Sequence, residues 1–356
     1  MIDPSVALAE QAYETLRREF AVAGRRSRGL FYEQRHRGRR HGALAFNWSF
    51  AHAFAAAIDV KGLGSGPTHS QIDDLLVGLD RYWDERRRTG YPAYSSTVVK
   101  RFSAGAKFFD DNAWCGLNLM RLHRIDPSRP GILARASAVL DFALDELARS
   151  ESGGIHWQQQ LGRASREVGT VANAANAQLA LRMYEATHQG QHLDAALAMC
   201  TWVNEHMRDP TNNLFWDHVT PPDDQVDTTQ WSYNQGLMIG VNVLLFRATG
   251  DPHYQRESMA IGDSALAAFD LARLRVEPVE FAAIFFRNLL LLTTVDDGLS
   301  APFLRRANEY LQLIWPSSVG DAGEADGERQ RLIEQAAIVE MIAMLCWPAN
   351  RYDLLV

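Results

Sequence analysis

The chain has 356 residues, of which 47% are apolar and 22% charged, and its formal net charge is −7. This composition is that of a globular protein with a large core, and it excludes an intrinsically disordered chain. The negative charge argues against nucleic acid as a partner. The chain has no run of 18 apolar residues, so no membrane span is expected. The three cysteines lie far apart in helix-like contexts, so neither a disulfide framework nor a zinc site is expected.

The N-terminal segment lacks the basic-then-apolar order of a signal peptide. It predicts a cytoplasmic protein, or a secreted one if a leader has been removed ahead of Met1. A run of arginines follows, which either contacts an anion or RNA or forms a solvated loop; we favour the loop because the chain as a whole is acidic. The run consists of Arg25, Arg26, Arg28, Arg35, Arg37, Arg39 and Arg40.

Helical periodicity dominates the rest of the chain and recurs as a repeat. Five segments begin with an asparagine, continue as an apolar helix, turn and open a second helix, at spacings of 65, 64, 58 and 54 residues. A last helix over 332–347 completes a sixth pair. We therefore expect an all-α protein, one (α/α)6 toroid of six helical hairpins in a single domain over residues 1–356, with an open helical solenoid as the alternative. The repeats start at Asn47, Asn112, Asn176, Asn234 and Asn288.

Four Asp-Asp pairs occur, and three have structural explanations. The pair 73–74 suits the start of a helix, 223–224 a proline-flanked loop, and 296–297 a turn. Asp110 and Asp111 differ, because they lie among aromatic residues just before a predicted inner helix. Apolar surroundings and a neighbouring carboxylate keep one acid protonated while the other is ionised. Glycoside hydrolysis needs that division of roles.

Aromatic residues recur near the starts of the predicted inner helices and in one loop. Their rings offer flat surfaces that match the apolar faces of sugars, although each ring by itself also suits core packing. Together they favour a sugar-binding cleft beside the carboxylate pair. They are Trp48, Trp114, Trp157, Trp231 and Tyr233.

Four motifs of the chain resemble glycoside hydrolase family 76, the α-1,6-mannanases. In chain order they read FFDDNAW, GGIHW, WSYNQG and FAAIFFRNL, and they cover most of the sequence. Two positions depart from the family pattern: Ala282 and Ala283 stand where the family has Lys-Gly, and the stretch VGTVAN, which ends at Asn173, lacks the usual Lys-Asn. Both changes bear on substrate identity more than on the chemistry.

The resemblance implies an (α/α)6 fold and retaining, endo-type cleavage of α-mannan or manno-oligosaccharides. It places the nucleophile at Asp110 and the acid/base at Asp111, with a carbohydrate as the partner and with neither a metal nor an organic cofactor. It also implies substrate-binding roles for Asn47, Trp48, Asn112, Trp114, Trp157, Asn173, Trp231, Tyr233, Asn234, Gln235 and Arg287. The oligomeric state is not predicted.

Two other classes of function stay open from the sequence. A sugar epimerase or isomerase on a similar toroid would use a histidine pair, for which His52 and His156 are the candidates. A non-catalytic glycan-binding homologue would explain the two departures from the family pattern. A zinc site at His188 and His192 is not expected, because Gly190 interrupts the helix that would align them.

Overall fold

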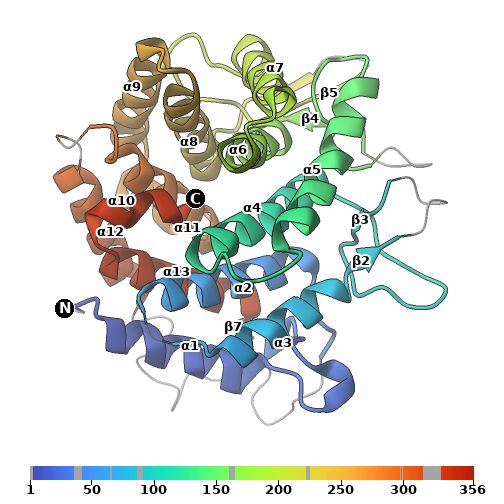
Figure 1. Ribbon diagram of the computed structural model, residues 1–356. Helices are drawn as coiled ribbons and strands as arrows, with labels where there is room; N and C mark the ends of the chain where they lie inside the picture. Colours follow the sequence, from blue (N-terminus) through green and yellow to red (C-terminus); the bar gives the residue numbers. More distant parts are fainter. Residues whose placement is uncertain are drawn as a thin grey trace.

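The computed structural model describes residues 3–35, 42–64, 66–85, 91–159, 165–221, 225–296, 298, 300–315 and 330–356. In these ranges the chain alternates between helices of an inner ring and helices that cover it from outside (Figure 1). The inner helices are α2 (Asn47–Gly62), α4 (Phe109–Ile125), α6 (Thr170–Thr187), α8 (Ser232–Thr249), α11 (Val279–Leu292) and α13 (Leu332–Cys346).

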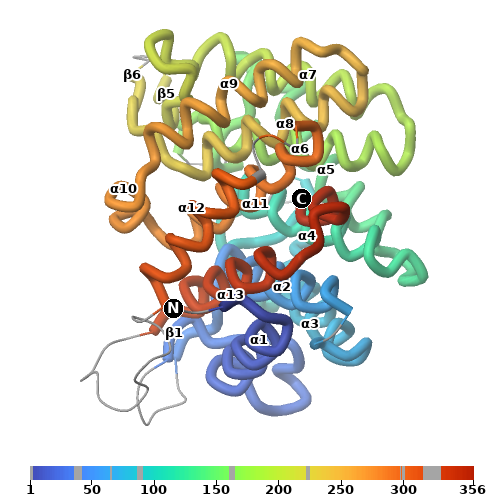
Figure 2. The backbone as a smooth tube through the Cα atoms, turned by 90° about the vertical axis from the view of Figure 1, so that its left-hand side faces the viewer, coloured from blue at the N-terminus to red at the C-terminus, as the bar shows by residue number. Residues whose placement is uncertain are grey.

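The outer helices each pack on one or two inner neighbours, as Figure 2 shows for α1 beside α13 and α9 beside α8. They are α1 (Val6–Phe20), α3 (His69–Asp80), α5 (Ile132–Arg149), α7 (Gly190–His206), α9 (Pro252–Ala268) and α12 (Ser300–Ile314), with the short α10 (Leu271–Val276) and the 3-10 helices η1 (Arg25–Ser27) and η5 (Ala349–Leu355) between or after them.

Short antiparallel strands join the loops at one end of the ring. β1 (Gln34–Arg35) pairs with β7 (Gln330–Arg331), and β2 (Trp83–Asp84) pairs with β3 (Ala93–Tyr94). The third sheet has the order β4 (Val168–Gly169), β5 (His218–Thr220), β6 (Gln225–Asp227).

The inner helices form a closed ring. Each contacts the next in chain order, and α13 contacts both α11 and α2, so the last hairpin meets the first. This closure confirms the predicted (α/α)6 toroid and excludes the open solenoid, in which the two ends would not meet. No helix in the described part of the chain is both long and apolar enough to cross a membrane.

Neighbours on both sides explain why the inner helices are apolar all round. On α2 nearly every residue is buried, and small side chains such as Ala55, Ala56 and Ala57 let other helices approach closely. The glycines of α8 serve the same purpose. A Cβ on Gly236 would lie 2.8 Å from the Cα of Phe285, so α8 and α11 pack backbone to backbone there.

The repeat was predicted with the wrong phase, although its period was right. Of the five asparagines, Asn47 alone is the first residue of its helix, and Asn288 lies four residues before the end of α11. The inner helices begin at residues 47, 109, 170, 232, 279 and 332, so the hairpins set the period while the asparagine occupies a different position within each helix.

Two features of the sequence lie in loops and on the surface. Arg28 forms an ion pair with Asp74, and Arg35 forms one with Glu19 at 2.8 Å. Part of the arginine run is thus neutralised by acids of the chain itself, which favours the solvated-loop interpretation. Arg37, Arg39, Arg40, Asp223, Asp224 and Asp297 lie outside the described residues.

Candidate active site

The N-terminal ends of the inner helices surround a pocket of about 500 Å³. The partial positive charge at each helix N-terminus favours carboxylates there. Asp110 and Asp111 occupy the first turn of α4, slightly later than the position before the helix that the sequence predicted. The ring contributes Trp48 and Ser49 from α2, Asp110 and Asp111 from α4, Val171 and Ala172 from α6, Tyr233 from α8, Phe281 from α11 and Arg331 at the start of α13.

The carboxyl of Asp110 is buried, but it accepts hydrogen bonds that stabilise its charged form. Burial raises its pKa to about 6. Trp157 Nε1 donates to Asp110 Oδ2 at 3.1 Å, and backbone amides of the first turn also lower the pKa, while the charge of Asp217 raises it. At neutral pH Asp110 is therefore mostly ionised.

Asp111 has the opposite environment. Burial, and then the charge of Asp110, hold the pKa of Asp111 well above its usual range. Among the described residues, no side chain or backbone group donates a hydrogen bond to this carboxyl. Asp111 thus keeps its proton more strongly than Asp110 does, which is the order needed for one acid and one nucleophile.

Aromatic rings line the pocket on two sides. Phe108 and Trp157 lie 4.7 Å apart between ring centroids, next to Asp110. Across the pocket, Tyr233 stacks on Phe281 at 4.1 Å. Trp231 packs against Phe281 edge-on at 5.5 Å and supports this wall from behind. Both pairs offer ring faces that suit sugar rings.

Replacing Trp157 by Phe should shift the pH profile of any reaction that needs Asp110 ionised. The ring stays, but the donor to Asp110 Oδ2 is lost, so the pKa of Asp110 rises above about 6. We expect the acid limb of kcat/KM to move to higher pH by roughly half a unit to one unit, with a loss of about three- to tenfold at pH 5. At pH 8 wild type and variant should be similar, which is the internal control. An unchanged acid limb would show that this hydrogen bond does not tune Asp110.

Buried amide side chains pin the loops of the pocket to the inner helices. Each bonds both the N–H and the C=O of one loop residue, as a neighbouring strand would. Asn112 does so with Tyr94 at 2.7 and 2.9 Å, and Gln235 with Phe215 at 2.7 and 2.9 Å. Asn173 holds Ile155 in the same way. We call these three contacts the amide staples.

The staples explain the polar residues of the family-like motifs without a ligand. Asn112, Asn173 and Gln235 are fully buried and do not line the pocket. Asn47 and Asn234 are also buried beneath it; Asn47 accepts from the Cys115 thiol, and Asn234 Nδ2 donates to Asp217 at 3.1 Å. Of the predicted substrate-binding residues, the structure brings Trp48, Trp157 and Tyr233 to the pocket with the two aspartates.

Arg287 and Trp114 lie elsewhere, around a cavity of about 40 Å³ deeper in the ring. Arg287 is buried and binds Asp59 Oδ2 at 2.6 Å and Glu340 Oε2 at 2.8 Å. It belongs to a charged network in the core, which the sequence motif by itself did not indicate.

The two histidines that motivated an epimerase also lie outside the pocket. His52 Nδ1 is 2.7 Å from Glu340 Oε1 beside the deeper cavity, and His156 Nδ1 is 2.5 Å from Glu146 Oε1. Among the residues that the structure describes, no histidine pair faces Asp110 and Asp111, so His52 and His156 do not support the epimerase hypothesis.

Among the further polar residues that line the pocket, four with a carboxyl or imidazole group were missed from the sequence. Glu33 accepts from Phe46 N–H and from Ser49 Oγ at 2.9 and 2.8 Å, and so caps α2. The others are Glu167, Asp217 and His218, on or near the third sheet. They lie in loops or, for His218, at the start of β5, with no recurring spacing, so no sequence pattern identified them.

Comparisons with known proteins agree with this architecture. The sequence profile described as Glycosyl hydrolase family 76 matches residues 23–324. A curated relative from Candida glabrata, named mannan endo-1,6-alpha-mannosidase DCW1, is 28% identical over 172 residues. That alignment covers 45% of this chain and 39% of the relative, so the chain spans well under half of the relative's length.

Solved structures match over nearly the whole chain. A family 76 α-mannanase of Bacteroides thetaiotaomicron has a TM-score of 0.84 at 20% identity, covering 96% of this chain and 95% of that one. An α-1,6-mannanase variant of a Salegentibacter species has a TM-score of 0.73 at 18% identity, covering 96% and 98%. That variant is described as inactive, with two consecutive aspartates replaced by asparagine, and in complex with α-1,6-mannotriose. At these identities the structural likeness shows the shared fold.

Proposed function

Because the chain belongs to glycosyl hydrolase family 76, we propose that it is a retaining endo-acting glycosidase that cleaves α-1,6-linked mannan or manno-oligosaccharides. The observation that carries the proposal is the carboxyl pair of Asp110 and Asp111 in one aromatic-walled pocket, with donors for the charged form of Asp110 alone. The relative named as an endo-1,6-α-mannosidase and the mannotriose complex support the choice of linkage.

The proposed reaction has two steps. Asp110 attacks the anomeric carbon with one carboxylate oxygen, while Asp111 gives its proton to the glycosidic oxygen and releases the leaving sugar. Asp111, now ionised, then takes a proton from a water molecule. The resulting hydroxide oxygen attacks the same carbon, frees Asp110 and leaves the product with its original configuration.

Incubation with α-1,6-mannan and with α-1,6-mannotriose tests the proposal. We expect shorter oligosaccharides of mixed sizes from the polymer, measured by mass, and an α-configured new reducing end, measured by NMR at early times. Products of β configuration would contradict retention. Release of mannose alone, without intermediate sizes, would contradict endo cleavage.

A glycan-binding protein without activity is the other outcome of the same experiment. In that case oligomannose would bind in calorimetry but stay intact over a long incubation. The raised pKa of both carboxyls argues against it, since a passive binding site gains nothing from desolvating two neighbouring acids.

A further inference from the structure

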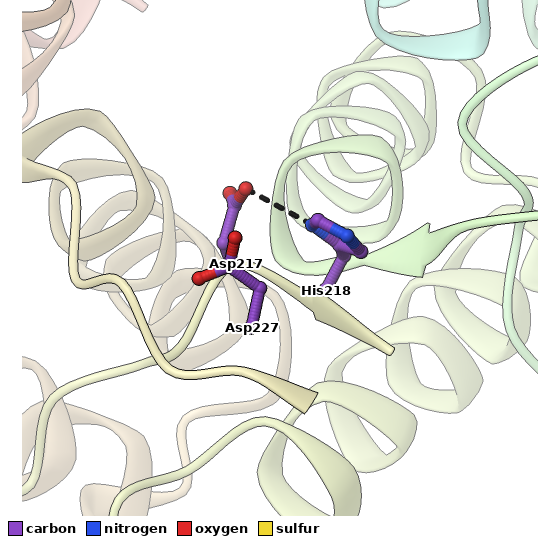
Figure 3. A group of neighbouring side chains, drawn as sticks. All are labelled: Asp217, His218 and Asp227. Atoms are coloured by element: carbon purple, nitrogen blue, oxygen red, sulfur yellow. Dashed lines mark hydrogen bonds and ion pairs between the residues drawn. The ribbon is translucent and has the colours of Figure 1, made fainter. Parts of the chain in front are cut away.

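His218 lines the same pocket as Asp110 and lies beside Asp217 and Asp227 (Figure 3). His218 Nδ1 lies 3.1 Å from Asp217 Oδ2, and its Nε2 lies 3.9 Å from Glu167 Oε1. Asp227 is the residue opposite His218 in the pairing of β5 with β6. His218 and Asp217 are both partly exposed to the pocket.

Asp217 is held by hydrogen bonds of its side chain and of its backbone. Its Oδ1 accepts from Asn234 Nδ2 at 3.1 Å, and Asn234 is fully buried in the first turn of α8. Its backbone is fixed as well, because its N–H donates to Asp227 O at 3.0 Å and its C=O accepts from Thr170 N–H at 2.9 Å. The contacts of the side chain thus fix which way its two oxygens point.

The carboxylate still has unused acceptor capacity. An ionised Asp offers about four lone pairs on its two oxygens. The donors from Asn234 and His218 use two of them, and about a fifth of the Asp217 side chain remains exposed in the pocket. Its charge also reaches Asp110, whose pKa it raises, so a ligand that touches Asp217 lies next to the reacting centre.

We propose that Asp217 accepts hydrogen bonds from hydroxyl groups of the sugar beside Asp110, and that His218 is a positioning residue that holds Asp217 in that orientation through Nδ1–H. This inference rests on the proposed glycosidase function. It assigns sugar selectivity to the β5 segment, which none of the sequence motifs covers. A neutral, hydroxyl-rich sugar fits this wall, because an anionic one would face three carboxylates.

The same side chains offer ligand atoms that all lie within 4.8 Å of one another in Asp217, His218 and Asp227, a spacing that a metal ion tolerates. The existing contacts account for the cluster without an ion. His218 Nδ1 already bonds Asp217, and Asp227 Oδ1 accepts from Thr229 N–H at 2.9 Å. A cation would have to displace both contacts, so we treat metal binding as the competing outcome.

Variants of His218 separate the roles of its two nitrogens. Asparagine places its Nδ2 near the position of Nδ1 and keeps the donor to Asp217, whereas glutamine reaches towards Glu167. We expect His218→Ala and His218→Gln to raise KM for α-1,6-mannotriose about tenfold with kcat within threefold of wild type. His218→Asn should restore KM to within threefold. The exposed His253 on α9 provides the control, His253→Ala, with unchanged constants.

A double-mutant cycle tests whether His218 acts through Asp217. Asp217→Asn should raise KM at least as much as His218→Ala, and adding His218→Ala to it should change KM by less than twofold. Additive effects would overturn the positioning role. Rescue by glutamine and not by asparagine would also overturn it, because the contact with Glu167 would then be the one that matters.

The remaining outcomes concern metal ions and the function itself. Each variant and the wild type are also heated with EDTA, Ca²⁺, Mn²⁺ or Zn²⁺. If one of these ions raises the Tm of the wild-type protein, and both His218→Ala and Asp227→Asn abolish that rise, a cation site replaces the proposal. If the wild-type protein leaves mannotriose and mannan intact, the proposed glycosidase function is overturned. This result is obtained before any variant is compared. If the wild-type protein is active and His218→Ala has an unchanged KM, only the inference about Asp217 and His218 is overturned.

Discussion

Replacing Asp111 by Asn is expected to abolish glycan cleavage and at the same time to stabilise the protein. The amide cannot give a proton to the glycosidic oxygen, so kcat should fall by about 10³-fold or more. The folded protein no longer has to bury an acid beside Asp110, which should raise Tm by roughly a few degrees. Activity is measured on mannan and Tm by scanning calorimetry.

The sign of the stability effect follows from the direction of both pKa shifts. Burial raises the pKa of Asp110 and of Asp111 above their values in the unfolded chain. Such groups favour the folded state at pH values below about 4, and that contribution is lost as the pH rises through the folded-state pKa, about 6 for Asp110. The stabilisation by Asp111→Asn should therefore be larger at pH 8 than at pH 4.

A matched control is Asp263→Asn on the outer helix α9, where the side chain is exposed. It should change neither activity nor Tm. Asp111→Asn that still cleaves mannan would remove Asp111 from the chemistry. A loss of activity together with a lower Tm would mean that the variant disturbs the pocket and does not report on the proton.

The second large effect is expected below the pocket, where Asp59→Ala should destabilise the protein by about 3–5 kcal/mol. Asp59 has no exposed surface and pairs with both Arg121 and Arg287. Burial by itself would lower the pKa of Arg287, but Asp59 and Glu340 hold it above the usual range. Without Asp59, two guanidinium groups would remain buried with one carboxylate between them. Urea unfolding followed by circular dichroism measures the loss.

An exposed ion pair gives the comparison for that measurement. Asp74→Ala removes the partner of Arg28 at the surface, where both side chains are more than a third exposed, and it should cost less than about 1 kcal/mol. Equal costs for Asp59→Ala and Asp74→Ala would mean that solvent reaches the core network.

The buried charged network should also lose its stabilising effect in acid. Burial opposes ionisation of Glu340, yet His52 and Arg287 hold its pKa below the usual range. Its contribution is thus present above about pH 4.5 and lost as the pH falls below it.

The period of the hairpins and the place of one Asp-Asp pair were enough to predict the ring and the carboxylates. Helix pairs of nearly equal length make the period visible in the sequence, and aromatic neighbours set Asp110 and Asp111 apart from the other pairs. Arg287 shows where such reasoning stops. Its motif indicates a polar residue on an inner helix, but the distance along the helix decides whether it faces the pocket or the core. Arg287 lies six residues, somewhat under two turns, after the pocket residue Phe281 on α11, and there it reaches Asp59.

The asparagines were misjudged for a related reason. An amide beside a cleft suits a sugar hydroxyl as well as a peptide group. The partners Tyr94, Ile155 and Phe215 come from loops whose course is set by tertiary packing, so the amide staples have no signature in the sequence. Asp217 and His218 were missed on the same grounds, since β5 reaches the pocket only through its pairing with β4 and β6.

The meeting of α13 with α2 also constrains how the chain folds. Arg287 bonds Asp59 across 228 residues of sequence, and Glu340 reaches His52 across 288. Closing the ring therefore needs contacts between segments far apart in the chain, which carry a larger loop-closure entropy than contacts within one hairpin. On the ribosome, His52 and Asp59 emerge long before their partners are synthesised, and until then the apolar flank of α2 that α13 covers is open to water. Newly made chains thus pass through an incomplete ring with an exposed apolar edge, and it is in that interval, more than in the finished molecule, that aggregation has to be avoided.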